Sequence, residues 1–269
     1  MMSKLRQYRQ LWRHFDSPLF VLASRMGWPA LSHFSYQLSV DGVDYSMLGR
    51  PTHGDLWVMR EVLIEQTYKQ LLPLLPSRPL RVVDVGAHIG SFTVWLHRTH
   101  GLSEAFCFEP DVDSFTICEF NLRRNGCPAT VQQRALGGRT REEDFWSDAT
   151  TAARHSLQRR STSSTAAARR VQVVGFAEWL RTVPGRFDVL KLDCEGAEWE
   201  LLDEAADAFS RFDVIVAEVH HDPTGAERDA RSIGTLLANK GFSTVSTAGL
   251  YLARQGAGDA HRVAAPVTA

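Results

Sequence analysis

The sequence lacks the features that mark several large classes of protein. Its four cysteines form no CxxC pair, which argues against a thiolate zinc site and against a secreted disulfide framework. Lys+Arg 30 against Asp+Glu 31 leave a formal net charge of -1, so there is no excess of positive charge for gripping a nucleic acid backbone. No stretch approaches the roughly 18 apolar residues of a membrane-spanning helix. We therefore expect a cytoplasmic protein with no membrane span and no nucleic-acid partner.

The main part of the chain alternates short apolar strands with helices. With 269 residues there is room for one large domain and an appendage. Strand–helix alternation over residues 80–255 predicts an α/β fold with a doubly wound, mostly parallel sheet. We expect strands at 80–85, 105–109, 130–136, 187–192 and 214–219, helices at 91–100, 111–125, 197–209 and 227–240, and an antiparallel pair of strands at 242–246 and 250–253 on one edge.

Residues 1–79 predict an N-terminal extension made of helices and a β-hairpin. Apolar residues at helical spacing indicate a helix within residues 1–36. A second helix is expected over residues 56–75, and it ends at Pro73. Between them, residues 38–45 alternate around Asp41-Gly42, a strong hairpin signal. The first helix has three alternative roles: docking on the domain, docking on a second copy in a homodimer, or lying on a membrane surface.

One segment, 139–170, interrupts the rhythm. It is rich in Arg, Ser and Thr, and two interpretations stay open. It is either a mobile surface loop or a lid-like insertion over an acceptor site, because long loops in compact domains are often lids. Residues 256–269 form a tail beyond the last expected strand.

A glycine turn between a strand and a helix is the sharpest motif. Gly86 and Gly90 allow a ligand to approach the backbone, and the helix that follows presents free N–H groups. His88 occupies the place where a dinucleotide fingerprint needs glycine. Asp84, two residues before the first glycine, suits a ligand that carries an ammonium and a sulfonium group.

A second acidic residue follows the next expected strand. Glu109 lies 23 residues after Gly86 and is followed by Pro110. A carboxylate at this place can accept hydrogen bonds from two ribose hydroxyls. The plain alternative is an ordinary acid at a strand end.

A third motif lies at the ends of two later strands. Residues 191–198 contain Asp193, Glu195 and Glu198, and the next strand ends at Glu218 and His220. Since ligands bind at the carboxyl ends of strands in open α/β sheets, these side chains are expected to meet in one cleft. For Glu198 the alternative is a favourable charge at the N-terminus of the next helix.

These motifs together resemble the FkbM-type methyltransferases. The resemblance covers roughly residues 60–220 and includes Asn121-Leu122, Asn125-Gly126 and 135–137 as well as the three motifs above. It implies a class I, Rossmann-like fold that uses S-adenosylmethionine to methylate hydroxyls of sugars or polyketide-type products. The sequence departs from the family at His88, where Asn is usual. The residues expected to bind the cofactor are Asp84, Gly86, Ala87, His88, Gly90, Ser91, Phe92, Glu109, Pro110 and Ala135.

The expected activity is O-methyl transfer to a small-molecule or carbohydrate acceptor. An alcohol is a poor nucleophile while protonated, so a base or a metal has to act on its proton. The candidate catalytic residues are Asp193, Glu195, Glu218 and His220. In a metal mechanism Asp193, Glu218 and His220 would hold Mg²⁺. The competing hypotheses are a nicotinamide-dependent oxidoreductase on the same topology and a cofactor-binding module without chemistry.

Overall fold

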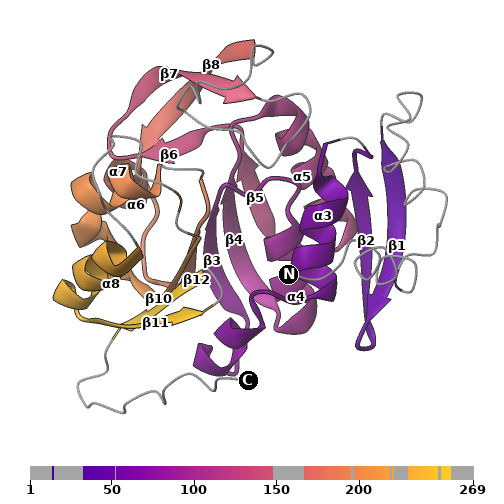
Figure 1. The fold of residues 1–269 in the computed structure, drawn as a ribbon, viewed down its shortest axis with the longest axis horizontal. Helices are drawn as coiled ribbons and strands as arrows, with labels where there is room; N and C mark the ends of the chain where they lie inside the picture. The colour runs from indigo at the N-terminus through magenta and orange to yellow at the C-terminus, as the bar shows by residue number, and fades with distance from the viewer. Residues whose placement is uncertain are drawn as a thin grey trace.

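The computed structural model describes residues 14, 33–51, 53–147, 167–194, 197–218, 220, 230–247 and 250–255. Its centre is a seven-stranded sheet with the order β11-β12-β10-β9-β3-β4-β5 (Figure 1). Neighbouring strands from β5 to β10 are parallel, and β12 runs antiparallel to both of its neighbours. The expected doubly wound, mostly parallel sheet with antiparallel C-terminal strands is confirmed. The bounds are β3 (Leu80–Val85), β4 (Leu102–Phe108), β5 (Ala129–Gln132), β9 (Phe187–Leu192), β10 (Phe212–Glu218), β11 (Phe242–Thr247) and β12 (Leu250–Gln255).

Helices cover both faces of this sheet. Figure 1 shows α4 (Ser91–Thr99) and α5 (Val112–Arg124) on one side, and α6 (Phe176–Thr182), α7 (Glu198–Glu204) and α8 (Ala230–Asn239) on the other. Because side chains alternate along a strand, Val82 and Val83 enter different cores. Strands buried on both faces explain the continuous apolar runs in the sequence. None of the described helices has the length and apolar run needed to cross a bilayer.

The N-terminal hairpin is confirmed. It consists of β1 (Phe34–Val40) and β2 (Val43–Gly49), and its two turn residues, Asp41 and Gly42, have φ of 51° and 80°. Positive φ at both turn residues is the hairpin geometry that Asp-Gly favours. Residues 34–36, expected to end a helix, belong to β1 instead, because their alternate side chains face the core. Of the rest of the expected N-terminal helix, the structure describes His14, which is helical, and His33, which is not.

The single helix expected over 56–75 is wrong. The structure has α3 (Asp55–Met59), then the π-helical turn η1 (Arg60–Ile64) and the 3₁₀ turn η2 (Lys69–Leu74). Gln66 between the two turns has a left-handed φ of 52°, which an α-helix cannot accommodate. Thr67 donates through its N–H and its hydroxyl to the carbonyl oxygen of Glu61 and closes the widened turn.

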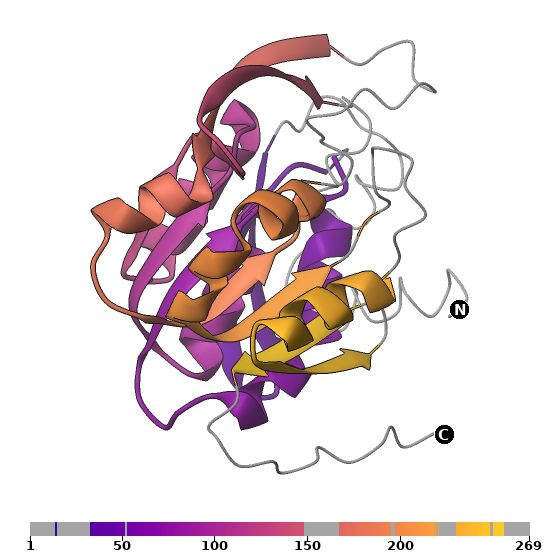
Figure 2. The same cartoon turned by 90° about the vertical axis from the view of Figure 1, so that its left-hand side faces the viewer.

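The strand expected over 130–136 is divided between two sheets. β5 ends at Gln132, and β6 (Ala135–Gly137) joins a second sheet with the order β6-β8-β7. β7 (Arg141–Ser147) and β8 (Ala167–Gly175) therefore form the two ends of the segment that was expected to be a loop or lid. Figures 1 and 2 show this second sheet at one end of the molecule. Residues 148–166 lie outside the described residues.

The helix expected over 197–209 is also shorter. α7 ends at Glu204, and a 3₁₀ turn, η4 (Ala206–Arg211), continues toward β10. This difference leaves the topology unchanged, because both pieces remain in the connection between β9 and β10.

One buried amide joins the hairpin to the central domain. The Asn121 side chain in α5 accepts from the Leu48 N–H at 2.6 Å and donates to the carbonyl oxygens of Leu48 and Ile89 at 3.0 and 2.8 Å. Nearby, the Asn125 side chain donates to the carbonyl oxygen of Ser46 and accepts from its N–H. The hairpin therefore shares a core and a set of hydrogen bonds with α5.

Replacement of Asn121 by alanine is expected to destabilise the protein. Leu48 and Ile89 would keep backbone groups without partners in a part-buried or buried place. The expected loss is about 1–3 kcal/mol in the free energy of unfolding. Urea unfolding of Asn121→Ala measures it, with Glu119→Ala on the exposed side of the same helix as the control. Equal stability of the two variants would contradict the role given to Asn121.

Candidate active site

A pocket lies at the carboxyl ends of β3, β4, β9 and β10. The chain leaves β3 toward β4 on one side, while β9 lies on the other, so this is the point where the strand order reverses. Ligands bind at such points in open α/β sheets. The pocket brings together these residues that the sequence singled out: Gly86, Ala87, His88, Ser91, Phe92, Glu109, Pro110, Ala135, Asp193, Glu218 and His220.

Three other candidate site residues are not among the described lining residues of this pocket. Asp84 is fully buried below the pocket and is not part of its wall; it accepts a hydrogen bond from the Thr93 hydroxyl at 2.7 Å. Gly90 opens α4 with a φ of 82° and lies against Cys118. Glu195 is outside the described residues. Asp84 thus contacts protein groups, whereas the sequence predicted contact with a ligand.

The buried ammonium group of Lys191 holds the floor of the pocket. Its Nζ lies 3.2 Å from Asp84 Oδ1 and 3.4 Å from Asp193 Oδ2, and donates to the carbonyl oxygen of Gly86 at 2.7 Å. Burial opposes the charged form, but the two carboxylates outweigh it, so the pKa of Lys191 is raised well above its usual value. The ends of β3 and β9 are therefore fixed to each other by charge.

The turn after β3 has room only for glycine at its first position. Gly86 has a φ of 75°, and a Cβ there would lie 1.8 Å from the carbonyl oxygen of Asp193. The N–H groups of Gly86 and Ala87 both donate to the carbonyl oxygen of Phe108 at 3.0 Å. The Asp193 N–H donates to the carbonyl oxygen of Val85. These contacts bring three strand ends together.

Glu109 joins two backbone turns at the pocket wall. Its Oε2 accepts from the His88 N–H at 2.8 Å and its Oε1 from the Asp111 N–H at 2.9 Å. Burial raises the pKa of Glu109 to about 7. A carboxylate has about four lone-pair sites, so capacity remains for ligand hydroxyls after these two bonds.

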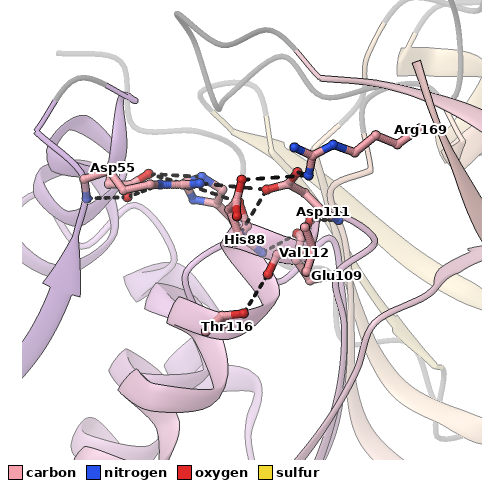
Figure 3. A network of polar contacts seen from close by, with 10 residues as sticks. Asp55, His88, Glu109, Asp111, Val112, Thr116 and Arg169 are labelled. Carbon is pink, nitrogen blue, oxygen red and sulfur yellow. Dashed lines mark hydrogen bonds and ion pairs between the residues drawn. The ribbon is translucent and has the colours of Figure 1, made fainter. Parts of the chain in front are cut away.

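An ion-pair network connects the N-terminal extension to the same turn. His88 Nε2 lies 3.4 Å from Asp55 Oδ1, and Arg50 Nε contacts Asp55 Oδ2 at 3.0 Å. Figure 3 shows this network continuing through Asp111 to Arg169 of β8. Burial opposes ionisation of Asp55, but His88 and Arg50 hold its pKa below the usual value. Residues preceding β3 therefore help to set the position of His88.

The other end of the pocket carries a histidine oriented by a buried glutamate. His220 Nδ1 lies 3.1 Å from Oε1 of Glu198, which also accepts from the Cys194 N–H at 2.6 Å. Trp199 Nε1 donates to the His220 carbonyl oxygen at 2.8 Å. Because a carboxylate can only accept, Nδ1 carries the hydrogen of this contact. Glu198 has this contact in addition to the helix N-terminus that the sequence indicated.

Glu218 lies beside this histidine at the end of β10. Burial, followed by the charge of Asp193, raises the pKa of Glu218 to about 7. Within the part of the chain that the structure describes, no three His, Cys, Asp or Glu residues are arranged to hold a metal ion. The Mg²⁺ alternative for Asp193, Glu218 and His220 therefore has no support in the described residues.

Sequence reasoning missed one wall of the pocket. Several lining residues come from the segment that was expected to be a plain helix, and β7 and the end of β9 add others. The lining residues of the 58–68 segment and Phe145 belong to no motif of the sequence, whereas Lys191 and Cys194 lie in the third motif but were given no role. The missed residues include Val58, Glu61, Val62, Thr67, Tyr68, Phe145, Lys191 and Cys194.

The raised pKa of Glu218 predicts a pH-dependent stability. The folded chain binds this proton more tightly than the unfolded chain, so the contribution to stability is complete below the ordinary glutamate pKa of 4.5 and is lost as the pH rises through about 7. The Glu218→Gln variant lacks this contribution. Urea unfolding at about pH 5 and about pH 8 should show a smaller decrease for the variant than for the wild type. A decrease as large as that of the wild type, with Glu119→Gln as control, would contradict the raised pKa.

A family model and several solved structures are similar to this chain. A family model described as the FkbM methyltransferase domain matches residues 84–244. A comparison with curated proteins finds no match. Among solved structures, the chain is similar to magnesium protoporphyrin IX methyltransferase from Synechocystis PCC 6803 with bound SAM, with 13% identity, a TM-score of 0.43, and coverage of 75% of this chain and 82% of that one.

Two further solved structures are similar. One is the T. thermophilus 16S rRNA N2 G1207 methyltransferase in complex with AdoMet and guanosine, with 17% identity, a TM-score of 0.44, and coverage of 84% and 51%. The other is ribosomal protein L11 methylase from Lactobacillus delbrueckii subsp. bulgaricus, with 16% identity, a TM-score of 0.39, and coverage of 71% and 80%. The family match spans more than half of the chain, including the glycine turn, Glu109 and Glu218, and the chain therefore belongs to the FkbM methyltransferase domain family.

Proposed function

We propose that this protein transfers the methyl group of S-adenosylmethionine to a hydroxyl of a sugar, glycoside or polyketide-type metabolite. The observation that carries the proposal is one continuous pocket with Glu109 and the Gly86 turn at one end and His220 at the other. A methyl transfer needs a cofactor site and a proton acceptor that open into the same space. The family match supports methyl transfer.

The residues at the first end fit the cofactor. The Ser91 hydroxyl is buried in the pocket wall and has no hydrogen-bond partner among the described residues. Glu109 would hold the ribose hydroxyls through its remaining lone pairs. Apolar walls suited to an adenine ring come from Phe108, Leu136 and Phe145. When bound, the cofactor supplies the activated methyl group.

The residues at the second end fit a base. His220 would accept the acceptor's hydroxyl proton at Nε2, because Nδ1 is held by Glu198. The buried Glu198 carboxylate then stabilises the imidazolium that forms. Asp193 is less suited to act as the base, since its carboxylate is already paired with the Lys191 ammonium group at 3.4 Å. We therefore assign the proton transfer to His220 and assign to Asp193 a role in fixing Lys191.

Cofactor binding is expected to stabilise the protein. S-adenosylhomocysteine at about 100 times its dissociation constant should add about 2.7 kcal/mol to the free energy of unfolding. Thermal unfolding with and without this ligand measures the shift, and NADH is the matched control for the oxidoreductase alternative. A shift with NADH and none with S-adenosylhomocysteine would overturn the proposed function.

Removal of the base is expected to slow turnover without loss of the cofactor. In His220→Ala the rate should fall by about 10²–10⁴-fold, the usual contribution of a positioned base. The assay measures transfer from radiolabelled S-adenosylmethionine to a panel of glycosides and polyketide-type metabolites, with products identified by mass spectrometry. His33→Ala, an exposed histidine ahead of β1, serves as control.

The affinity for S-adenosylhomocysteine separates the two ends of the pocket. It should change by less than about threefold in His220→Ala, because no cofactor contact is assigned to His220. Near-normal turnover in this variant would place the base elsewhere. The same assay after EDTA treatment tests the metal mechanism directly, since a His220 base acts without a metal.

A further inference from the structure

The acceptor end of the pocket carries negative charge that the protein does not compensate. Glu61 of η1 and Glu218 of β10 both line the pocket. Neither carboxylate has an ion-pair or hydrogen-bond partner within the described ranges. Among the described lining residues, Lys191 is the only lysine or arginine. Its ammonium group already forms ion pairs with Asp84 and Asp193. Glu61, which is exposed, and Glu218 therefore have no ion-pair partner in the pocket lining, although the charge of Arg60 acts on Glu61.

These carboxylates act on one another. After burial, the charges of Asp193 and Glu61 are among the causes that raise the pKa of Glu218 to about 7. Like charges that share a site disfavour the ionised form, and a cation placed among them reverses the effect. A positively charged ligand would therefore be stabilised by these carboxylates, whereas a neutral ligand would leave the repulsion between them unchanged.

A tyrosine hydroxyl that opens into the pocket provides an independent indication of a ligand at the same place. Tyr68 is 5% exposed and lines the pocket, and its hydroxyl makes no hydrogen bond to any residue that the structure describes. The charges that act on this hydroxyl are mainly those of Lys191, Asp193 and Glu218. Buried tyrosine hydroxyls usually have a partner, so a hydroxyl that faces a cavity without one indicates a ligand group.

The ring of Tyr68 is held firmly. It packs edge-on against Phe92 with the ring centroids 4.8 Å apart, and it contacts Trp95 at 6.2 Å. The position of the hydroxyl is therefore set by the core and does not depend on solvent-exposed groups. Its aromatic neighbours belong to α4, the helix that begins at the glycine turn.

We propose that the acceptor is a hydroxylated compound that also carries a protonated amine, bound by Glu61, Glu218 and the Tyr68 hydroxyl. The inference rests on the proposed function and narrows its substrate class to cationic acceptors such as amino sugars. The ammonium group donates to the two carboxylates and to the phenol oxygen. Hydrogen bonds between charged groups are the strong ones, so the amine fixes the orientation of the hydroxyl that reacts. Glu61 and Tyr68 come from the segment before β3, which makes that segment the part of the chain that selects the acceptor.

The test compares acceptors that differ only in charge. The full chain is assayed with radiolabelled S-adenosylmethionine and a panel of amino sugars, aminocyclitols and amine-bearing glycosides, each paired with its N-acetyl derivative. The amine member of a pair should have a kcat/KM at least about 10-fold higher, and mass spectrometry should locate the methyl group on oxygen.

Two variants test the proposed contacts. Glu61→Gln should raise KM for the amine at least about fivefold and leave kcat within about twofold, because Glu61 holds the amine and not the reacting atoms. Tyr68→Phe should shift KM in the same direction. The rise in KM for the amine should exceed the rise for its N-acetyl derivative in both variants, because only the amine makes the charged contact. Glu65→Gln, which replaces a glutamate of the same segment that pairs with Arg60 outside the pocket lining, is the matched control and should behave as the wild type.

Each remaining outcome has a definite meaning. If the N-acetyl derivatives react as well as the amines, the cationic acceptor is overturned and the proposed function stands. The same holds if N-acetyl derivatives are methylated but none of the amines is. If S-adenosylhomocysteine does not bind in a calorimetric titration, the proposed function itself fails. Unchanged KM for the amines in both variants would overturn the assignment of Glu61 and Tyr68.

Discussion

The ammonium group of Lys191 is the contact on which the centre of this structure depends. It lies in the floor of the pocket between β3 and β9 and holds Asp84, Asp193 and the carbonyl oxygen of Gly86. A buried charge without partners costs several kcal/mol, so these groups must stay together in the folded state. The acid that opens the glycine motif is thereby committed to the protein. The pocket wall above Asp84 is therefore formed by backbone groups, by Glu109 and by the side chains of later strands.

The segment before β3 is part of the site and not an appendage placed beside it. Asn121 hydrogen-bonds β2 to α5, and Asp55 contacts His88 within the network of Figure 3. The residues between η1 and η2 then bring Glu61 and Tyr68 to the pocket. A change of sequence in this segment can therefore alter acceptor binding while the glycine turn and Glu109 stay the same.

The two ends of the pocket differ in their electrostatics. At the end with Glu109, two backbone N–H groups and apolar walls surround one carboxylate. At the other end, Glu61, Asp193 and Glu218 line the pocket together with His220, whose imidazole is oriented by Glu198. In the proposed mechanism, the base lies beside these carboxylates. The same charges favour a cationic acceptor, so proton transfer and substrate selection depend on one group of side chains.

The sequence by itself determined the strands of the central sheet, the hairpin at Asp41-Gly42 and the meeting of the three motifs in one place. These follow from local rules: the period of the side chains, turn chemistry and the common edge at which parallel strands end. Tertiary structure alone decided that Asp84 pairs with Lys191, that residues 130–136 divide between two sheets, and that Glu61 and Tyr68 reach the pocket. The physical reason is that each depends on a partner far away in the chain. A buried charge selects its counter-ion by position in the fold, and a helix breaks where packing against other elements outweighs its own hydrogen bonds.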